Sequence, residues 1–254
     1  MRISNDVLAV LSRSETKGNA LTLPPEQLER KLYESVDKVL KACGGKWDRK
    51  SKTHIFTDNA AVRLDEIILS GEVEIPKDEF NYFPSPPAVV ERLIELAEIN
   101  PGMRILEPSA GQGAIAKACV EQGAIVDCAE ILKENAILLM SLRFRSVTKE
   151  DFLTITPSEI YDRVVMNPPF RLRQDIKHVL HALKFLKPGC KLVSVMSASV
   201  LFREDKLTKD FRDLVDSRGG FFEELPDGSF KESGTMIKTV IAAIPAGSKF
   251  YDNR

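Results

Sequence analysis

The sequence predicts an α/β protein built around a doubly wound, mostly parallel sheet. Two observations lead to this fold class. From about residue 80, short apolar runs of strand length alternate with longer segments whose apolar residues recur at helical spacing. Strands that alternate with helices of this length form βαβ units. Later runs at 221–225 and 237–244 flank a Pro-Asp-Gly turn region and predict a C-terminal antiparallel hairpin.

The alternating region supplies its elements in a regular order. The expected strands are 104–107, 124–130, 146–152, 163–166 and 191–197, and the expected helices are 88–99, 113–122, 133–144, 172–186 and 206–217. The late hairpin would add an antiparallel edge to this sheet. We therefore expect one large domain over residues 79–254.

Residues 1–78 have a different pattern and predict a small α+β unit. A helix is expected to begin at Pro24, where prolines suit the first turn, and to end at Gly44 and Gly45. Residues 46–56 predict a short basic hairpin with its turn at residues 48–52, and residues 60–70 predict a second helix. This helix–hairpin–helix unit is interpreted as a DNA-binding or lid module.

Composition limits the possible partners and location. The chain has 254 residues, 43% hydrophobic residues, a net charge of −1 and a pI of about 6.4. No global basic field is present, so any nucleic-acid contact must come from local patches. The four cysteines, Cys43, Cys119, Cys128 and Cys190, form no CxxC pair, and no histidine stands at ligand spacing, so no metal site is expected. Without a signal peptide or a long apolar span, we expect a cytoplasmic protein without membrane contact.

The most informative motif follows the strand 163–166. It consists of Asn167, Pro168, Pro169 and Phe170. Proline cannot donate to a sheet ladder, so the strand must stop there in a stiff turn. The Asn167 side-chain oxygen and the Pro168 carbonyl can accept hydrogen bonds from an exocyclic amino group, while an aromatic ring stacks on the base. The motif therefore suits the binding of a flat, amino-bearing group.

A glycine loop follows the first strand of the large domain. The loop reads Glu107-Pro108-Ser109-Ala110-Gly111-Gln112-Gly113, with Ala116 in the place of a third glycine. Glycines allow a tight turn and close approach to a ligand, as in dinucleotide-binding loops. An anionic Glu107 would repel a pyrophosphate but suits a cationic ligand, through water or backbone contacts.

Acidic residues stand at the ends of the next two strands. Glu130 lies nineteen residues after Gly111, where an acidic residue binds ribose hydroxyls in this fold class, and Ile131 follows it. Asp151 could accept from an adenine amino group and Phe152 could pack on the ring. Glu130 could equally cap the next helix, and Asp151 could be a solvated turn residue.

Before the first strand, Tyr82, Phe83, Pro84 and Ser85 precede an amphipathic helix. Prolines start helices well, and Ser85 suits a cap, but capping does not explain the aromatic pair. The order of lead-in, glycine loop and Asn-Pro-Pro-Phe motif over residues 80–245 resembles class I S-adenosylmethionine (SAM) amino methyltransferases, in particular the phage- or plasmid-type DNA adenine-N6 enzymes.

This resemblance implies a Rossmann-like sheet, SAM as the cofactor and transfer of a methyl group to adenine N6 in DNA, without a metal. The implied cofactor-binding residues are Tyr82, Phe83, Pro84, Ser85, Glu107, Pro108, Ala110, Gly111, Gly113, Glu130, Ile131, Asp151, Phe152 and Asn167. The implied catalytic residues are Asn167, Pro168, Pro169 and Phe170. The base must be flipped out of a duplex to reach them.

Substrate contacts are expected on both sides of the motif. Phe170 would stack on the flipped base, and Phe230 from the late hairpin would cover its other face. Arg171 near the motif, and Arg49 with Lys50 in the N-terminal hairpin, would contact phosphates of duplex or single-stranded DNA.

Three other functions fit the same motifs. The Asn-Pro-Pro-aromatic arrangement also serves adenine in structured RNA and glutamine amides in proteins. A non-catalytic SAM-binding subunit would have the same fold. Asn167 itself counts against a cytosine-N4 enzyme, which more often has Ser or Asp at this position.

Overall fold

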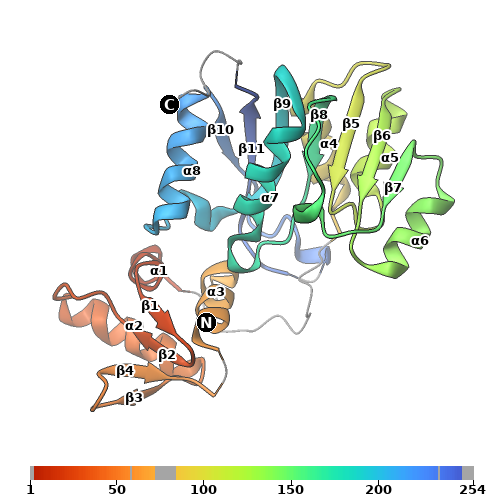
Figure 1. Ribbon diagram of the computed structural model, residues 1–254. Coiled ribbons are helices and arrows are strands. Elements are labelled where there is room, and N and C mark those ends of the chain that lie inside the picture. The colour runs from red at the N-terminus through yellow and green to blue at the C-terminus, as the bar shows by residue number, and fades with distance from the viewer. Residues whose placement is uncertain (1–2, 58, 72–83, 234, 248–254) are drawn as a thin grey trace.

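The computed structural model describes residues 3–57, 59–71, 84–233 and 235–247, and these residues form two separate sheets (Figure 1). A four-stranded sheet has the order β1-β2-β4-β3, and a seven-stranded sheet has the order β10-β11-β9-β8-β5-β6-β7. The expected domain boundary between residues 78 and 79, and the expected cofactor residues Tyr82 and Phe83, lie outside the described residues.

The N-terminal unit surrounds the small antiparallel sheet. Its elements are α1 (Asn5–Ser12), β1 (Glu15–Lys17), β2 (Ala20–Thr22), α2 (Arg30–Ala42), β3 (Lys46–Asp48), β4 (Thr53–Ile55) and α3 (Ala60–Ser70). It has a core of its own, which includes Leu11, Leu21, Leu40 and Ile67. Figure 1 shows α3 beside the large sheet, where it packs against the short 3-10 helices η2 (Arg171–Arg173) and η4 (Ala198–Leu201).

The expected hairpin of this unit is present as β3 and β4, and the expected second helix is α3. Asn59 caps α3 by accepting from the backbone N–H groups of Ala61 and Val62, and Gly71 ends it in the left-handed conformation. The other expected helix begins at Arg30 rather than Pro24. Helix α1 was not predicted. The β1–β2 hairpin was not predicted either, because three-residue strands are too short to show alternation.

The large sheet confirms the predicted fold class. Its strands are β5 (Arg104–Pro108), β6 (Ile125–Ala129), β7 (Ser146–Thr148), β8 (Tyr161–Met166), β9 (Leu186–Ser197), β10 (Phe221–Glu224) and β11 (Thr239–Pro245). Parallel pairing runs from β7 through β6, β5 and β8 to β9, while β11 is antiparallel to both β9 and β10. The sheet is therefore mostly parallel with an antiparallel hairpin at one edge.

Helices cover both faces of this sheet. They are α4 (Pro87–Ala97), α5 (Ala114–Glu121), α6 (Lys133–Ser141), α7 (Gln174–Ala182) and α8 (Lys206–Ser217), with the 3-10 helices η1 (Phe152–Thr154), η3 (Leu183–Phe185) and η5 (Lys231–Ser233). Val165 packs in one apolar cluster with α4 and α5, and its neighbour Val164 packs in another with α7 and α8. Successive strand residues point to opposite faces, so the parallel strands are buried on both sides.

Several expected elements have different bounds in the structure, and two of these differences have identifiable reasons. The strand expected over 146–152 ends at Thr148, because Asp151 caps η1 by accepting from the backbone N–H of Leu153 at 3.0 Å. The helix expected over 172–186 starts at Gln174, because Leu172 and Arg173 both have left-handed backbone angles. None of the described helices is long and apolar enough to span a membrane.

Asp127 ties three strands together in the interior of the large sheet. Its carboxylate accepts from Arg104 Nε at 3.0 Å, Arg145 Nη1 at 2.7 Å and Ser146 Oγ at 2.6 Å. Burial by itself would raise the pKa of Asp127, but the hydrogen bonds from Ser146 and Arg104 outweigh it, and the pKa lies below its ordinary value. The folded protein therefore favours the ionised carboxylate at this position.

We predict that Asp127→Asn lowers the free energy of unfolding at pH 7 by about 2 kcal/mol, because charged hydrogen bonds are lost. A carboxyl group whose pKa is lower in the folded than in the unfolded protein stabilises the fold fully at pH values above its unfolded pKa, about 3.9. This contribution is lost as the pH falls through the pKa of the folded protein. Urea unfolding should show a constant difference between the two proteins from pH 7 to about pH 5 and a smaller one below about pH 4.

Asp213→Asn, on the exposed surface of α8, is the matched control and should change the stability by less than about 0.5 kcal/mol. A difference for Asp127→Asn that stays the same at acidic pH would contradict this account of the carboxylate.

Candidate active site

A cavity of about 330 Å³ lies where the carboxyl ends of several parallel strands meet. Open α/β sheets bind ligands at this edge. The residues that line the cavity are Ser109, Ala129, Glu130, Ile131, Leu132, Glu150, Asp151, Phe152, Leu153, Asn167, Pro168, Pro169, Phe170, Arg171, Leu172, Gln174 and His178. They come from the segments that follow β5, β6, β7 and β8, and the volume is that of a small-molecule site.

The structure brings the acidic and aromatic residues expected for a cofactor together with the Asn-Pro-Pro-Phe motif. Glu130, Ile131, Asp151 and Phe152 line the same cavity as residues 167–170. Pro84, Pro108, Ala110, Gly111 and Gly113 are not among its lining residues. Sequence reasoning did not assign eight further lining residues to the site: Ser109, Ala129, Leu132, Glu150, Leu153, Leu172, Gln174 and His178.

Glu130 joins the glycine loop to the end of β6. One carboxylate oxygen accepts from the backbone N–H of Gly111 at 2.7 Å, and the other accepts from the backbone N–H of Leu132 at 2.7 Å. Ser109, Gly111 and Gly113 all have positive φ angles, so the loop turns tightly. Glu130 therefore fixes the loop that faces the cavity, and its predicted contact with a ribose stays a prediction.

Glu107, near the end of β5, is also buried. Its carboxyl oxygen Oε2 accepts from the backbone N–H of Ala116 at 2.6 Å, in the first turn of α5. Burial raises the pKa of Glu107 well above its usual range, and the hydrogen bond from Ala116 opposes this shift. Glu107 does not line the cavity, and its predicted contact with a cofactor, through water or backbone, stays a prediction.

Asn167 follows β8 and contacts the segment that precedes α4. Its Nδ2 donates to Ser85 Oγ at 3.1 Å, across 82 positions of sequence, and this bond orients the carboxamide. Pro84, beside Ser85, accepts at its carbonyl from Ser233 Oγ at 2.7 Å. Residues 84 and 85, the Asn-Pro-Pro-Phe motif and Ser233 therefore lie close together.

Aromatic rings form one wall of the cavity. Phe152 is buried, and its ring centroid lies 4.9 Å from that of His181 and 5.9 Å from that of His178. His178 Nδ1 donates to the backbone carbonyl of Gln174 at 2.8 Å. Burial lowers the pKa of His178, so this ring is neutral at pH 7. The wall is apolar and suits a planar ring.

The prediction for Phe230 requires a correction. Its side chain is fully buried in the same apolar cluster as Leu93 and Ile241, and it does not line the cavity. The turn after Pro226 folds back, with Ser229 N–H donating to the Pro226 carbonyl at 3.1 Å, and carries the ring into the core. Phe230 is therefore a core residue rather than a stacking platform.

The remaining predicted substrate residues lie in two places. Phe170 lines the cavity, although its side chain is almost entirely buried. Arg171 also lines it and forms an ion pair with Glu66 of α3, with 3.2 Å between Nη2 and Oε1. Arg49 and Lys50 are exposed in the β3–β4 turn, which projects away from the large sheet (Figure 1). The structure does not bring this turn to the cavity.

Among the described residues, no group of three or more metal-ligating side chains occurs. The cysteines at positions 43, 119, 128 and 190 are unpaired.

Comparison with solved structures identifies the class of fold. A proposed RNA methyltransferase from Pyrococcus horikoshii matches with a TM-score of 0.51 and 20% identity, over 68% of this chain and 92% of that one. A dimethyladenosine transferase from Plasmodium falciparum matches with a TM-score of 0.51 and 17% identity, over 68% of this chain and 66% of that one. No protein-family model and no curated protein sequence matches the chain. The chain thus has the Rossmann-like fold of these methyltransferases.

We predict that Gly113→Ala disrupts the glycine loop. The φ of Gly113 is +78°, and an added Cβ would lie 2.8 Å from the buried Leu139 side chain. Backbone strain and overpacking together should lower the free energy of unfolding by about 2 to 4 kcal/mol, measured by urea unfolding.

Gly219→Ala is the matched control, because Gly219 has a φ of +69° but nothing within 4 Å of an added Cβ. Strain alone should cost about 1 kcal/mol there. Equal losses for the two variants would show that the close packing around Gly113 does not matter.

Proposed function

We propose that the chain transfers a methyl group from SAM to the exocyclic N6 amino group of adenine in DNA. The observation that carries this proposal is the meeting of two sets of residues in one cavity. Asn167 and the two prolines, which suit an amino group, line it together with Glu130 and Asp151, which suit the ribose and adenine of a cofactor. The fold and the position of the cavity support the same proposal.

The residues present fit SAM. A glycine loop with three positive φ angles allows close backbone approach, a carboxylate stands at the end of the second strand, and the buried ring of Phe152 provides an apolar wall. When bound, SAM supplies an electrophilic methyl group on a sulfonium. Glu130, Ile131, Asp151 and Phe152 would hold its nucleoside part.

The protein's part in the reaction follows from the motif. The Asn167 carboxamide oxygen and the Pro168 carbonyl would accept hydrogen bonds from the two N–H bonds of the adenine amino group. These acceptors stabilise the positive charge that develops on nitrogen during attack, and they cost no reorganisation because Ser85 already orients the amide. Phe170 would support the flipped base from the cavity wall. Alignment with the methyl donor would also raise the rate. The sulfonium would become a neutral thioether as its bond to the methyl group breaks, and the proton that the nitrogen loses would pass to solvent.

A local basic patch favours a nucleic-acid substrate. Lys46, Arg49, Lys50 and Lys52 are all exposed on the β3–β4 hairpin, beside Trp47 with 40% of its surface exposed. The whole chain has a net charge of −1, so this concentration of positive charge is local. Phosphate contacts of this kind supply sequence-independent affinity for DNA. RNA adenine and protein glutamine amides remain the alternative substrates for the same amino-binding motif.

We predict that Asn167→Ala retains SAM binding and loses methyl transfer. Removing one preorganised acceptor should lower the single-turnover rate about 100- to 1,000-fold. The SAM dissociation constant, measured by calorimetry, should change by less than about threefold because the nucleoside contacts are intact. Asn100→Ala, at an exposed loop position, is the control. Undiminished methyl transfer by Asn167→Ala would refute the amino-binding role.

We predict that replacing both Arg49 and Lys50 with Ala weakens DNA binding and flattens its salt dependence. Each lost phosphate contact lowers the slope of log K against log salt by about 0.9. The double variant Arg30→Ala/Lys31→Ala removes the same charge from an exposed part of α2 and is the matched control. If both double variants bind DNA like the wild type over a salt titration, the hairpin has only a structural role.

A further inference from the structure

The segment directly after the catalytic motif has an unusual backbone. Leu172 has φ 54° and ψ 33°, and Arg173 has φ 58° and ψ 32°. L-residues with side chains rarely adopt this left-handed conformation, and consecutive examples are less common still. Such a conformation persists only when surrounding contacts hold it. Residues 171–173 must therefore be fixed by something outside the segment.

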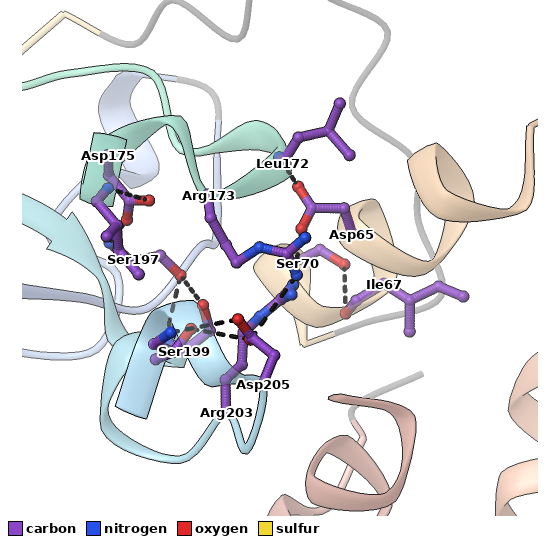
Figure 2. Close-up of polar contacts among 12 residues, drawn as sticks. Asp65, Ile67, Ser70, Leu172, Arg173, Asp175, Ser197, Ser199, Arg203 and Asp205 are labelled. Carbon is purple, nitrogen blue, oxygen red and sulfur yellow. Dashed lines mark hydrogen bonds and ion pairs between the residues drawn. The ribbon is translucent and has the colours of Figure 1, made fainter. Parts of the chain in front are cut away.

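The fixing contacts come from α3 of the N-terminal unit. The backbone N–H of Leu172 donates to Asp65 Oδ2, and the other carboxylate oxygen of Asp65 accepts from Arg203 Nη2 at 2.7 Å (Figure 2). The neighbouring Glu66 pairs with Arg171, at 3.2 Å. Two successive acidic residues of α3 thus bind two successive residues of the segment that follows Phe170.

Arg203, the second partner of Asp65 in this junction between α3 and the large domain, is also held in place. Arg203 lies just after η4, where its backbone N–H donates to the Ser199 carbonyl at 3.0 Å and its carbonyl accepts from Arg212 Nη1 at 2.8 Å. Asp65 and Arg203 each expose only 3% of the side chain. Burial lowers the pKa of Arg203, and the charge of Asp65 opposes this shift. The ion pair is a buried, charged contact between α3 and the segment that joins η4 to α8.

The kinds of contact in this junction indicate that it positions the chain after Phe170. A buried ion pair adds little net stability, because desolvation offsets the attraction between the charges. Three of the four buried side-chain atoms without a hydrogen-bond partner, among the residues that the structure describes, lie here: Arg171 Nε, Gln174 Oε1 and Arg203 Nε.

We propose that Asp65 and Glu66 are positioning residues for the Asn-Pro-Pro-Phe motif. They hold residues 171–173 in the left-handed conformation and so fix the chain that leads away from Phe170. Helix α3 of the N-terminal unit thereby completes the active site through the contacts of Asp65 and Glu66 with residues 171–173. This inference rests on the proposed function, since it concerns the geometry of that site. A small displacement of Asn167 or Phe170 is sufficient to slow a reaction that depends on alignment.

The test uses the full chain with Asp65→Asn and Glu66→Gln. Glu223→Gln is the matched control, because Glu223 forms a bidentate ion pair with Arg92, at 2.8 and 2.6 Å, that joins α4 to β10 away from the motif. Hydrogen exchange of the amides in residues 170–173 is followed by mass spectrometry. The rate of single-turnover methyl transfer is divided by the concentration of SAM-binding sites, so that a loss of folded protein does not lower the measured rate.

We expect exchange at residues 170–173 to rise at least about tenfold in Asp65→Asn and less in Glu66→Gln, since local opening becomes easier. The single-turnover rate should fall about tenfold, with the SAM dissociation constant within about twofold of the wild type. Adding Leu172→Gly to Asp65→Asn should recover at least about threefold of this rate, because glycine adopts the left-handed conformation without strain. A purely structural role would not give this rescue.

The proposal would be overturned if Asp65→Asn had the same hydrogen exchange at residues 170–173 and the same single-turnover rate as Glu223→Gln. If Asp65→Asn does not fold, the half-buried Glu66→Gln decides by the same two measurements. The exchange experiment needs no enzymatic activity. A wild-type chain that methylates nothing would therefore refute the proposed function while the exchange result still decides whether α3 holds the segment.

Discussion

The candidate site depends on the parallel pairing of β5, β6 and β8. Only parallel neighbours bring their carboxyl ends to one edge of a sheet, and here that edge receives the glycine loop, Glu130 and Asn167 together. The pairing itself depends on helices that bury both faces of the strands, with Val164 and Val165 in different clusters. A carboxylate, Glu130, then joins two of these strand ends through backbone N–H groups.

The N-terminal unit has a core of its own and contacts the large domain through both apolar packing and charge. Leu69 of α3 belongs to an apolar cluster of the large sheet, and the buried Asp65–Arg203 ion pair lies between the same two parts. Packing supplies the stability of each part, whereas a buried pair with defined geometry specifies one relative position. The same helix that carries Asp65 also carries Glu66, so the position of α3 and the backbone of residues 171–173 are set together.

Much of the architecture could be predicted, because hydrophobic periodicity reports burial directly. The doubly wound sheet, the late hairpin, α3 and α8 all followed from it. Asn167 was predictable as part of the cavity because two prolines force the chain out of the sheet. Phe230 was misassigned because sequence does not show to which side a loop ring turns. The left-handed conformation of Leu172 and its hydrogen bond to Asp65 could not be predicted, because the two residues are 107 positions apart and no local sequence pattern indicates the contact.

The most direct test of the central claim is methyl transfer from isotopically labelled SAM. The wild-type chain is offered unmethylated duplex DNA, single-stranded DNA, structured RNA and cell-extract protein in parallel, and the labelled product is digested and identified. The account predicts N6-methyladenine in DNA. Label found only in RNA or on glutamine would keep the amino-binding motif and contradict the substrate. Bound SAM with no label in any acceptor would contradict the assignment of this cavity as a methyltransferase active site.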